Sequence, residues 1–544
     1  MRAVLLLLLL VPVTQLARSQ GHLDCPFGFQ DVSEHVGIVF NPQDKTTGPT
    51  VGDLNQDGYL DIVQCNHVRF PMEVYYGSEK GSFTRQRAFK TKMDRHGTAT
   101  GDVDGNGKLD IVLAIGGDNG IKPLPPREVR TSSDGELHEI SIEEAGLGGR
   151  MLRGVAPRLL DIDRDGDLDL FVLSRPSLDL SNVIRHAVYE NLGTEPNGNG
   201  TYQLINYTGI EKSVGQAGFL VTDVDSDGYP DIFILSPGVR FYRGRPKRKF
   251  VDKTSCLPLG LRSSGPYGGA VQLDIDNDGD MDILFSGGLR LKTKLLKSGR
   301  DVLLENLSEN VTDANCGFRY ADVTETANLR TDGIRHGITA ADFNNDGFID
   351  IFMPEVGPGG ARINDTIMLN LGNKSFLGFT DHGANGPLEG DITYPTGAQA
   401  FDYDRDGLVD IVVATRYNQG NQSQGYLRLF KNTVENGNNY LIVQVPVSID
   451  GKTTMDALLT VRTGGGSFHR VVGSVGEFRT QSFIDQVHFG LGNNSVVLSI
   501  DLKLMEGTLY AFGGCAANQM IPLLSLAMIA PSPSVSPPSS CSPL

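Results

Sequence analysis

The chain has 544 residues, of which 39% are hydrophobic and 21% are charged, and it contains 66 glycines. This composition is typical of a folded, turn-rich protein and excludes an intrinsically disordered chain. The formal net charge of −17 excludes a general binder of nucleic acid or of anionic membranes, because such a protein needs a basic face.

The first residues have the pattern of a secretory signal peptide. A basic start at Arg2 precedes an apolar run over residues 4–13, and residues 17–19 read Ala-Arg-Ser, a small-x-small cleavage signal. A buried first helix is the alternative, but the unbroken leucines of residues 5–10 leave it no polar face. We therefore expect residues 1–19 to be a signal peptide and the protein to be secreted, into the extracellular space or matrix.

From residue 25 to residue 432, one pattern recurs seven times. Each copy has a run of small residues, an acidic loop with the frame Asp-x-[Asp/Asn]-x-[Asp/Asn]-Gly-x-x-Asp, and an apolar pair. Segments that combine an aromatic residue with β-branched residues accompany the loops at 27–33, 250–254, 318–324 and 376–380, and their composition is that of half-buried strands. Four short strands per copy predict an all-β fold, a seven-bladed β-propeller over residues 25–432. We expect strands from both chain ends to complete its first blade.

The acidic loops have the chemistry of calcium sites. Ca²⁺ takes about six to eight oxygen ligands, and a short loop converges on the ion only when alternate side chains turn to one side. Positions 1, 3, 5 and 9 would supply these ligands, and the glycine at position 6 permits the sharp turn. The predicted ligands, for up to seven Ca²⁺, are Asp53, Asn55, Asp57 and Asp61; Asp102, Asp104, Asn106 and Asp110; Asp161, Asp163, Asp165 and Asp169; Asp223, Asp225, Asp227 and Asp231; Asp274, Asp276, Asp278 and Asp282; Asp342, Asn344, Asp346 and Asp350; and Asp402, Asp404, Asp406 and Asp410.

Other interpretations of the loops are less favourable. EF-hands are disfavoured because the loops close with Asp at position 9 instead of Glu at position 12 and are flanked by strands. Mg²⁺ is disfavoured because it demands a tight octahedron and keeps several waters. Metal-free Asx turns at hairpin tips remain an alternative for one copy, and seven copies with an intact position 9 argue against them. A loop with Asn in place of one Asp, such as the loop at Asp102, should release its ion first, and the loop at Asp161, with four carboxylates, should be among the tighter sites.

Catalysis is not expected. A catalytic pair of carboxylates would be unique, whereas each pair here is a copy of the others. His96 and His336 precede two of the loops and could ligate a metal, but structural hydrogen bonding is favoured because five repeats lack a histidine there.

The pattern changes near residue 432. Residues 438–510 are strand-like without an acidic loop and predict a small β module. Residues 511–544 include a Pro/Ser-rich run and predict a disordered tail. No run after the signal segment approaches the ~20 apolar residues that a membrane span needs, so we expect none.

Cysteines and sequons fit a secreted glycoprotein. The six cysteines, an even number, predict disulfides, with Cys256 and Cys316 a plausible pair because they flank one repeat. Eight Asn-x-Ser/Thr sequons occur, at Asn199, Asn206, Asn306, Asn310, Asn364, Asn373, Asn421 and Asn493.

The repeats resemble the FG-GAP/VCBS repeats of integrin-α-like propellers, in which the acidic loop binds Ca²⁺. The segments 439–443, 470–474 and 488–492 (His-Phe-Gly-Leu-Gly) resemble the ASPIC/UnbV module, and the combination resembles the cartilage acidic protein family of secreted matrix proteins. The chain departs from that family where its module would end in Trp-Pro-x-Gly, since residues 504–507 read Leu-Met-Glu-Gly, and it has no EGF-like cysteine pattern at its end.

These observations predict a secreted calcium-binding glycoprotein, not an enzyme, that acts as an interaction scaffold for extracellular proteins or glycans through propeller loops. The alternative is an extracellular carbohydrate-active enzyme or lectin-like binder on the same scaffold, which would need a unique polar cluster at the propeller axis. A cell-surface receptor fragment is a third reading, and it would need a membrane anchor.

Overall fold

The computed structural model describes residues 25–529 except 40–45, 67–70, 90–92, 117–122, 133, 176–185, 194–199, 212, 214–217, 237, 264, 291–295, 298, 308–314, 330–331, 357–362, 386–392, 420–421 and 474–478. The fold is all-β. Within these ranges the α-helices are two short segments, α1 (Ile142–Ala145) and α2 (Leu259–Ser263).

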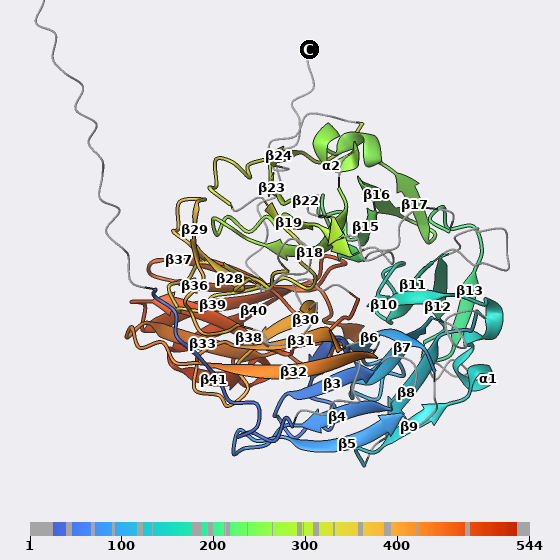
Figure 1. Cartoon of the computed structure of the whole chain (residues 1–544), viewed down its shortest axis with the longest axis horizontal. Coiled ribbons are helices and arrows are strands. Elements are labelled where there is room, and N and C mark those ends of the chain that lie inside the picture. The colour runs from blue at the N-terminus through green and yellow to red at the C-terminus, as the bar shows by residue number, and fades with distance from the viewer. Residues whose placement is uncertain are drawn as a thin grey trace, which may run out of the picture.

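Seven four-stranded antiparallel sheets make up the first part of the chain (Figure 1). In chain order, each from its first to its last strand, they are β2 (Thr46–Gly52), β3 (Asp61–Asn66), β4 (Met72–Tyr76), β5 (Thr84–Phe89); β6 (Arg95–Gly101), β7 (Asp110–Ile115), β8 (Arg127–Thr131), β9 (Leu137–Ile140); β10 (Gly154–Leu160), β11 (Asp169–Ser174), β12 (Ala187–Asn191), β13 (Tyr202–Ile205); β14 (Phe219–Thr222), β15 (Asp231–Ser236), β16 (Gly238–Arg245), β17 (Lys249–Asp252); β18 (Tyr267–Leu273), β19 (Asp282–Gly287), β23 (Val302–Asn306), β24 (Tyr320–Asp322); β26 (Thr339–Ala341), β27 (Asp350–Met353), β28 (Thr366–Asn370), β29 (Phe376–Phe379); and β30 (Thr393–Phe401), β31 (Asp410–Gln419), β32 (Gln422–Asn432), β1 (Phe29–Asp31).

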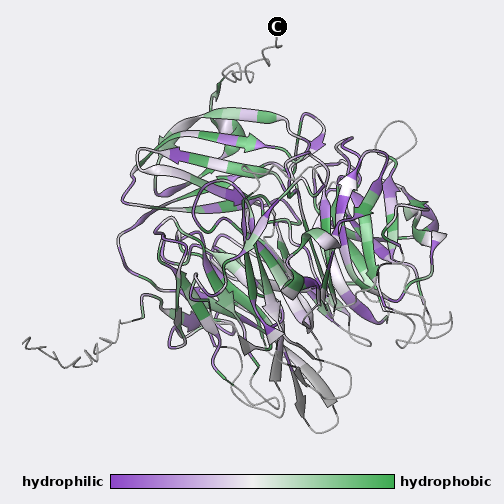
Figure 2. Cartoon of the chain, turned by 90° about the horizontal axis from the view of Figure 1, so that it is seen from above, coloured by the Kyte–Doolittle hydropathy of each residue, from purple (hydrophilic) through white to green (hydrophobic). Residues whose placement is uncertain are grey.

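Hydrophobic clusters between neighbouring sheets join the seven sheets into a closed ring. One cluster spans the first three sheets, and others join the third to the fourth, the fourth to the fifth, the fifth to the sixth and the sixth to the seventh. A further cluster, with Val51 and Ile62 from the first sheet and Val412 and Leu429 from the seventh, closes the ring. The second strands are apolar on both faces because each sheet lies between two others, and Figure 2 shows hydrophobic residues concentrated in the strands. The fold is therefore a seven-bladed β-propeller.

The N-terminal strand completes the last blade. β1 pairs with β32, with Phe29 opposite Asn432 and Asp31 opposite Phe430. The expectation that both chain ends complete the first blade is therefore wrong. β2 to β5 form that blade without help, so the N-terminal segment supplies the outermost strand of the seventh.

The four aromatic and β-branched segments are the outermost strands of their blades. They contain β1, β17, β24 and β29, each at the edge of a four-stranded sheet. In β1, Phe29 is buried whereas Gln30 and Asp31 are exposed, as expected for an edge strand that packs on one face only. The prediction of strands at these positions is confirmed.

The C-terminal module contains two sheets and a short hairpin. A three-stranded sheet contains β38 (Gln486–Gly492), β33 (Asn439–Gln444) and β41 (Gln519–Pro522), and a five-stranded sheet contains β37 (Gly466–Val471), β36 (Leu458–Thr463), β39 (Val496–Lys503), β40 (Leu509–Ala516) and β42 (Met528–Ile529); the hairpin is β34 (Ser448–Ile449) with β35 (Lys452–Thr453). The predicted module end at residue 510 is wrong, because β40, β41 and β42 continue to Ile529. β41 pairs in parallel with β33, a long-range contact that the Pro/Ser composition of the tail concealed. Residues 530–544 lie outside the described residues.

Two hairpin-like pairs lie beside the fifth blade. β20 (Leu289–Arg290) pairs with β21 (Leu296–Lys297), and β22 (Gly299–Arg300) pairs with β25 (Asp332–Gly333). β20, β21 and β22 belong to the connection from β19 to β23, and β25 belongs to the connection from β24 to β26. The spacing between the acidic loops is longest here because of these insertions.

The predicted disulfide between Cys256 and Cys316 is present. Cys25, Cys65 and Cys515 are free thiols, and Cys541 lies outside the described residues. Within the described ranges there is no helix long and apolar enough to cross a membrane.

The sequons differ in exposure. Asn206, Asn364, Asn373 and Asn493 are exposed. Asn306 is buried at the end of β23, where its backbone N–H donates to Asp282. Asn199, Asn310 and Asn421 lie outside the described residues.

Candidate metal centres

Each acidic loop is the turn of a hairpin between the first and second strands of a blade. Position 9 begins the second strand and pairs with the residue that precedes position 1. This register is the same in all seven copies: Gly52 with Asp61, Gly101 with Asp110, Leu160 with Asp169, Thr222 with Asp231, Leu273 with Asp282, Ala341 with Asp350 and Phe401 with Asp410. The loops therefore present the same geometry at one end of the propeller.

Two loop positions adopt the left-handed backbone conformation. The position 6 glycines have φ between 83° and 99°, at Gly228 and Gly166 respectively, which explains why glycine recurs there. Position 4 also has positive φ in every copy. It is a glycine only at Gly105, and in the other copies it carries a side chain, as at Arg164 (φ 72°) and Arg405 (φ 61°). The constraint at position 4 was not predicted, because the residue type there varies.

The Asp at position 1 organises the turn. In all seven loops its Oδ2 accepts a hydrogen bond from the N–H of the position 6 glycine, at 2.7–3.0 Å. The side chain at position 5 instead accepts the N–H of position 7, as Asp57 does from Tyr59 at 2.8 Å and Asn106 does from Lys108 at 2.8 Å. The loop is thus pre-folded by its own side chains.

The Asp at position 9 has a second, structural role that was not predicted. Its Oδ2 accepts the N–H of position 2, and its Oδ1 accepts a backbone N–H at the end of the third strand. In the second blade these donors are Val103 and Thr131, each at 2.9 Å from Asp110. The same pair of bonds, at 2.7–3.1 Å, occurs in every blade. We call this arrangement the position 9 latch.

An asparagine at the end of the third strand links neighbouring blades. The Nδ2 of Asn191 donates to the carbonyl of Val103 at 2.8 Å, and Asn370 and Asn432 donate in the same way to Ile275 and Phe343. Each acceptor is position 2 of the preceding acidic loop. The recurring Asn-Leu at strand ends was the sequence signal for this contact.

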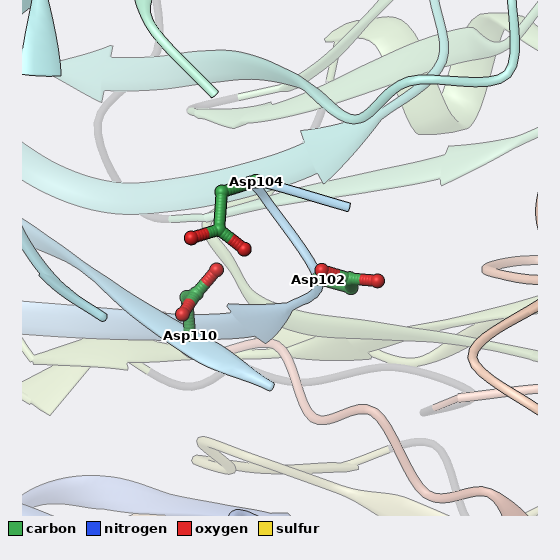
Figure 3. A group of neighbouring side chains, drawn as sticks. All are labelled: Asp102, Asp104 and Asp110. Atoms are coloured by element: carbon green, nitrogen blue, oxygen red, sulfur yellow. The ribbon is translucent and has the colours of Figure 1, made fainter. Parts of the chain in front are cut away.

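Carboxylates converge in five loops. In the loops that begin at Asp102, Asp161, Asp223, Asp274 and Asp402, one oxygen each from positions 1, 3 and 9 lies within 4.8 Å of the others. Figure 3 shows Asp104 and Asp110 pointing toward each other with Asp102 beside them. Position 5 is not part of these groups. The loops at Asp53 and Asp342 have Asn at position 3 and therefore offer fewer carboxylates.

The convergent groups fit a cation bound by oxygen. The Oδ1 atoms of Asp102, Asp163 and Asp402 are buried and have no hydrogen-bond partner. Burial raises the pKa of Asp53 and Asp102 to about 6 and that of Asp161 and Asp402 to about 7. Ionising several such carboxylates side by side destabilises the folded protein, and a bound divalent cation would neutralise their charges.

Basic side chains contact position 3 in four of these loops. Arg248 Nη2 lies 2.5 Å from Asp163 Oδ2. Arg243 pairs with Asp225, Lys374 with Asp276 and Lys431 with Asp404. Within the described ranges no ion pair reaches the acidic residues of the loop at Asp102. A cation entering the other four loops would therefore compete with a lysine or an arginine.

The loops are joined to one another around the ring. The position 4 side chain of one loop reaches the next: Gln56 donates to the carbonyl of Gly107, Asn277 to that of Gly347 at 3.1 Å, and Asn345 to that of Gly407 at 3.0 Å. The guanidinium of Arg405, in the last loop, lies 3.9 Å from the ring centroid of Tyr59 in the first. These contacts link the acidic loops at four of the seven junctions around the ring, and we call the ring of loops the belt.

The C-terminal module lies on this belt. His488 Nε2 contacts the carbonyl of Gly407 at 3.0 Å, Thr453 N–H donates to that of Gly166 at 2.9 Å, and Gln486 Nε2 donates to that of Gly58 at 2.7 Å. The segment 479–485 continues into the ring, where Gln481 N–H donates to Thr98 and Thr100 N–H donates back to Gln481. The module therefore covers the loop face and fills part of the axis.

The two histidines lie at the opposite end of the innermost strands from the acidic loops. His96 Nδ1 is 2.9 Å from the carbonyl of Gly154, and its Nε2 is 3.3 Å from Asp94 Oδ2. Burial lowers the pKa of His96 to about 4, so the ring is neutral at physiological pH. His336 is also buried. His96 thus has the hydrogen-bonding role that the sequence favoured.

Comparisons with known proteins agree with this architecture. The model of an FG-GAP-like repeat matches residues 223–285, which contain the loops at Asp223 and Asp274. Cartilage acidic protein 1 of Xenopus tropicalis is 24% identical over 503 residues, which cover 86% of this chain and 72% of that protein, and the human protein is 23% identical over 512 residues, which cover 86% and 70%. The resemblance to the cartilage acidic protein family is confirmed.

Similarity to solved structures is weaker. The crystal structure of rhamnogalacturonan lyase YesW is 14% identical, covers 74% of this chain and 75% of its own, and superposes with a TM-score of 0.35. The Vibrio cholerae biofilm matrix protein Bap1 is 13% identical, covers 88% and 69%, and has a TM-score of 0.30. Similarity at this level carries no argument about activity.

Proposed function

We propose that the chain is a secreted calcium-binding glycoprotein that acts as an interaction scaffold in the extracellular space or matrix. The observation that carries the proposal is the repeated convergence of the carboxylates at positions 1, 3 and 9 in five of the seven loops. An all-oxygen, carboxylate-rich donor set in a short loop suits Ca²⁺ better than the softer transition metals, which prefer nitrogen and sulfur.

The bound ions would be structural. Each would neutralise carboxylates that belong to one hairpin turn, and the hairpins lie on the belt that carries the C-terminal module. Calcium binding to the folded chain alone would stabilise it by mass action. The loops at Asp53 and Asp342 share the geometry but have fewer carboxylates, so up to seven ions are proposed.

Secretion and glycosylation have separate support. The first 19 residues have the pattern of a signal peptide, Cys256 and Cys316 form a disulfide, and four sequons are exposed. Disulfides persist in oxidising compartments. The similarity to cartilage acidic protein 1, whose name indicates a protein of cartilage, supports a place in the extracellular matrix.

The partner surface would lie away from the acidic loops. The module covers the loop face, which leaves the opposite face and the outer strands for extracellular proteins or glycans. A carbohydrate-active enzyme or lectin-like binder is the alternative on this scaffold. Against an enzyme stand the sevenfold repetition of the carboxylates and the burial of His96, whose neutral ring is held by Gly154 and Asp94.

Affinity capture tests the scaffold proposal. Purified chain, immobilised through its C-terminus, would be incubated with extracellular matrix extract in calcium and, in parallel, with a chelator. The proposal predicts specific partners that are retained in calcium and reduced in chelator, since loss of the ions loosens the blades. Turnover of matrix polysaccharides by the purified chain, without retained partners, would favour the alternative.

A further inference from the structure

Asp485 of the C-terminal module is a buried carboxylate without full hydrogen bonding. It is 8% exposed, and its Oδ1 has no hydrogen-bond partner. Its Oδ2 has one weak contact, to Gln444 Nε2 at 3.4 Å. An ionised carboxylate in this position is costly unless it is paired or binds a cation.

Asp485 faces the first acidic loop. Together with Asp53, Asp57 and Gly58 it lines a cavity of about 460 Å³ between the propeller and the module. The next residue, Gln486, donates to the carbonyl of Gly58 at 2.7 Å, which fixes this part of the module on the loop. Burial and, after it, the charge of Asp53 raise the pKa of Asp485 to about 7.

The first loop lacks the carboxylate at position 3. Asn55 stands there, and its Nδ2 donates to Asp57 Oδ2 at 3.0 Å. Within the described ranges no ion pair reaches Asp53, Asp57 or Asp485. The guanidinium of Arg405 lies over the ring of Tyr59, and its charge acts on Asp485 without forming an ion pair.

We propose that Asp485 and the first acidic loop form one shared cation site, in which Asp485 supplies the carboxylate that Asn55 lacks. The occupant is a divalent cation with a preference for oxygen ligands, and Ca²⁺ suits a carboxylate donor set. The ion would fasten the C-terminal module to the propeller. This inference rests on the proposed calcium binding by the acidic loops.

The sixth loop provides an internal contrast. It also has Asn at position 3, Asn344, but there the module presents Arg470, whose Nη2 donates to the carbonyl of Gly347 at 3.3 Å and lies 4.0 Å from Asp342 Oδ2. The module therefore adds a positive charge to one Asn-containing loop and a negative charge to the other. Of these two loops, only the first receives from the module a negative charge that a shared cation would neutralise.

The test compares Asp485→Asn with a matched control. Asp456→Asn also removes a buried carboxylate of the module that contacts the propeller, since Asp456 Oδ1 lies 2.6 Å from Arg158 Nη2, and within the described ranges its side chain has no hydrogen bond or ion pair to an acidic loop. Bound calcium per chain is measured by elemental analysis after equilibrium dialysis at fixed free calcium. We expect D485N to bind one ion fewer than the native chain, or to bind that ion about tenfold or more weakly, and D456N to bind the native number.

A rescue variant separates ligation from packing. Asn55→Asp in the D485N chain returns a carboxylate to the first loop and should restore the missing ion. In chelator, D485N should melt at or above the native temperature, because the variant removes a buried orphan charge. Equal calcium content in D485N and native chain would overturn the inference while leaving the proposed function intact, whereas absence of calcium from the native chain would remove both.

If D485N does not fold, hydrogen exchange of the native chain decides. The N–H of Val445 donates to the carbonyl of Asp485 at 2.9 Å, so its protection reports on the docked segment. Removal of calcium should accelerate exchange in residues 444–447 and 485–487. Unchanged exchange there, with calcium lost from the other loops, would overturn the shared site.

Discussion

Gln481 of the C-terminal module and Leu159 of β10 exchange two hydrogen bonds: Gln481 Oε1 accepts from the Leu159 N–H at 2.7 Å, and Gln481 Nε2 donates to the Leu159 carbonyl at 3.0 Å. The amide side chain thus pairs with an innermost strand of the propeller much as a neighbouring strand would. Gln481 is fully buried, so this contact ties the module to the axis without water.

Gln481→Ala should destabilise the whole protein. It leaves a buried N–H and a buried carbonyl of Leu159 without partners, at a cost of about 1–3 kcal/mol each. We expect a lower melting temperature by calorimetry in calcium, with a loss of about 2–5 kcal/mol. Gln203→Ala, on the exposed side of β13, is the control and should change stability by less than about 0.5 kcal/mol. Equal melts for the two variants would refute the axial contact.

Two Asp residues of the second loop should behave differently on substitution. Asp110 is the position 9 latch, whose two oxygens accept backbone N–H groups, whereas Asp104 accepts one N–H, from Asn106 at 3.2 Å, and faces the cation position. Asp110→Ala should lower stability by about 2–5 kcal/mol with or without calcium. Asp104→Ala should lower the melting temperature in calcium but leave it nearly unchanged in chelator. Chemical denaturation in both conditions measures the difference, and a purely calcium-dependent effect of D110A would contradict the latch.

Stability of the calcium-free protein should fall as the pH rises. Burial raises the pKa of Asp53 to about 6, of Asp161 and Asp274 to about 7 and of Asp61 to about 8, above the values of the unfolded chain. The folded state then binds more protons, so the stabilisation is complete below about pH 4 and is lost as the pH rises through 6 to 8. Melting in calcium-free buffer from pH 5 to pH 8 should show this decrease. Calcium, which binds the ionised carboxylates, should reduce or reverse it, and a rising melt without calcium would contradict the account.

Arg248 should weaken calcium binding to the third loop. It lies 2.5 Å from Asp163 Oδ2 and also contacts Glu190, so an entering ion must displace it. Because a partly exposed ion pair contributes up to about 1 kcal/mol, Arg248→Gln should raise the affinity of this site by up to about fivefold. Calcium titration followed by calorimetry measures the affinity of this site in the native chain and in the variant. Arg245→Gln, which removes a 2.7 Å contact with Asp227 at position 5 of the fourth loop, is a control that should leave the third loop unchanged.

The local parts of the site could be predicted from the sequence. The position 6 glycine and the alternate carboxylates encode a turn through contacts that stay within a segment of nine residues. Seven copies of that segment imply seven blades. The latch was hidden because the donor to Asp110, at Thr131, lies 21 residues away at the end of the next strand, β8. The contact between Arg248 and Asp163 could not be predicted, because the charge of an arginine does not indicate which acidic side chain it will contact in the fold.

Long-range contacts explain the remaining errors. The pairing of β1 with β32 joins residues about 400 positions apart, and nothing in the sequence near Phe29 selects the seventh blade over the first. Gln481 is separated from Leu159 by 322 residues, so the docking of the module could not be foreseen. Asn306 matches a sequon, but its position at a strand end against the Asp282 latch buries it.

The most direct test of the central claim is a calorimetric melt of the purified chain with its calcium content measured in parallel. The account predicts several bound Ca²⁺ per chain, up to seven, and a melting temperature that falls substantially when excess chelator removes them, since an ion that binds only the folded state stabilises it. A chain that carries no calcium, or a melt that is unchanged in excess chelator, would contradict it.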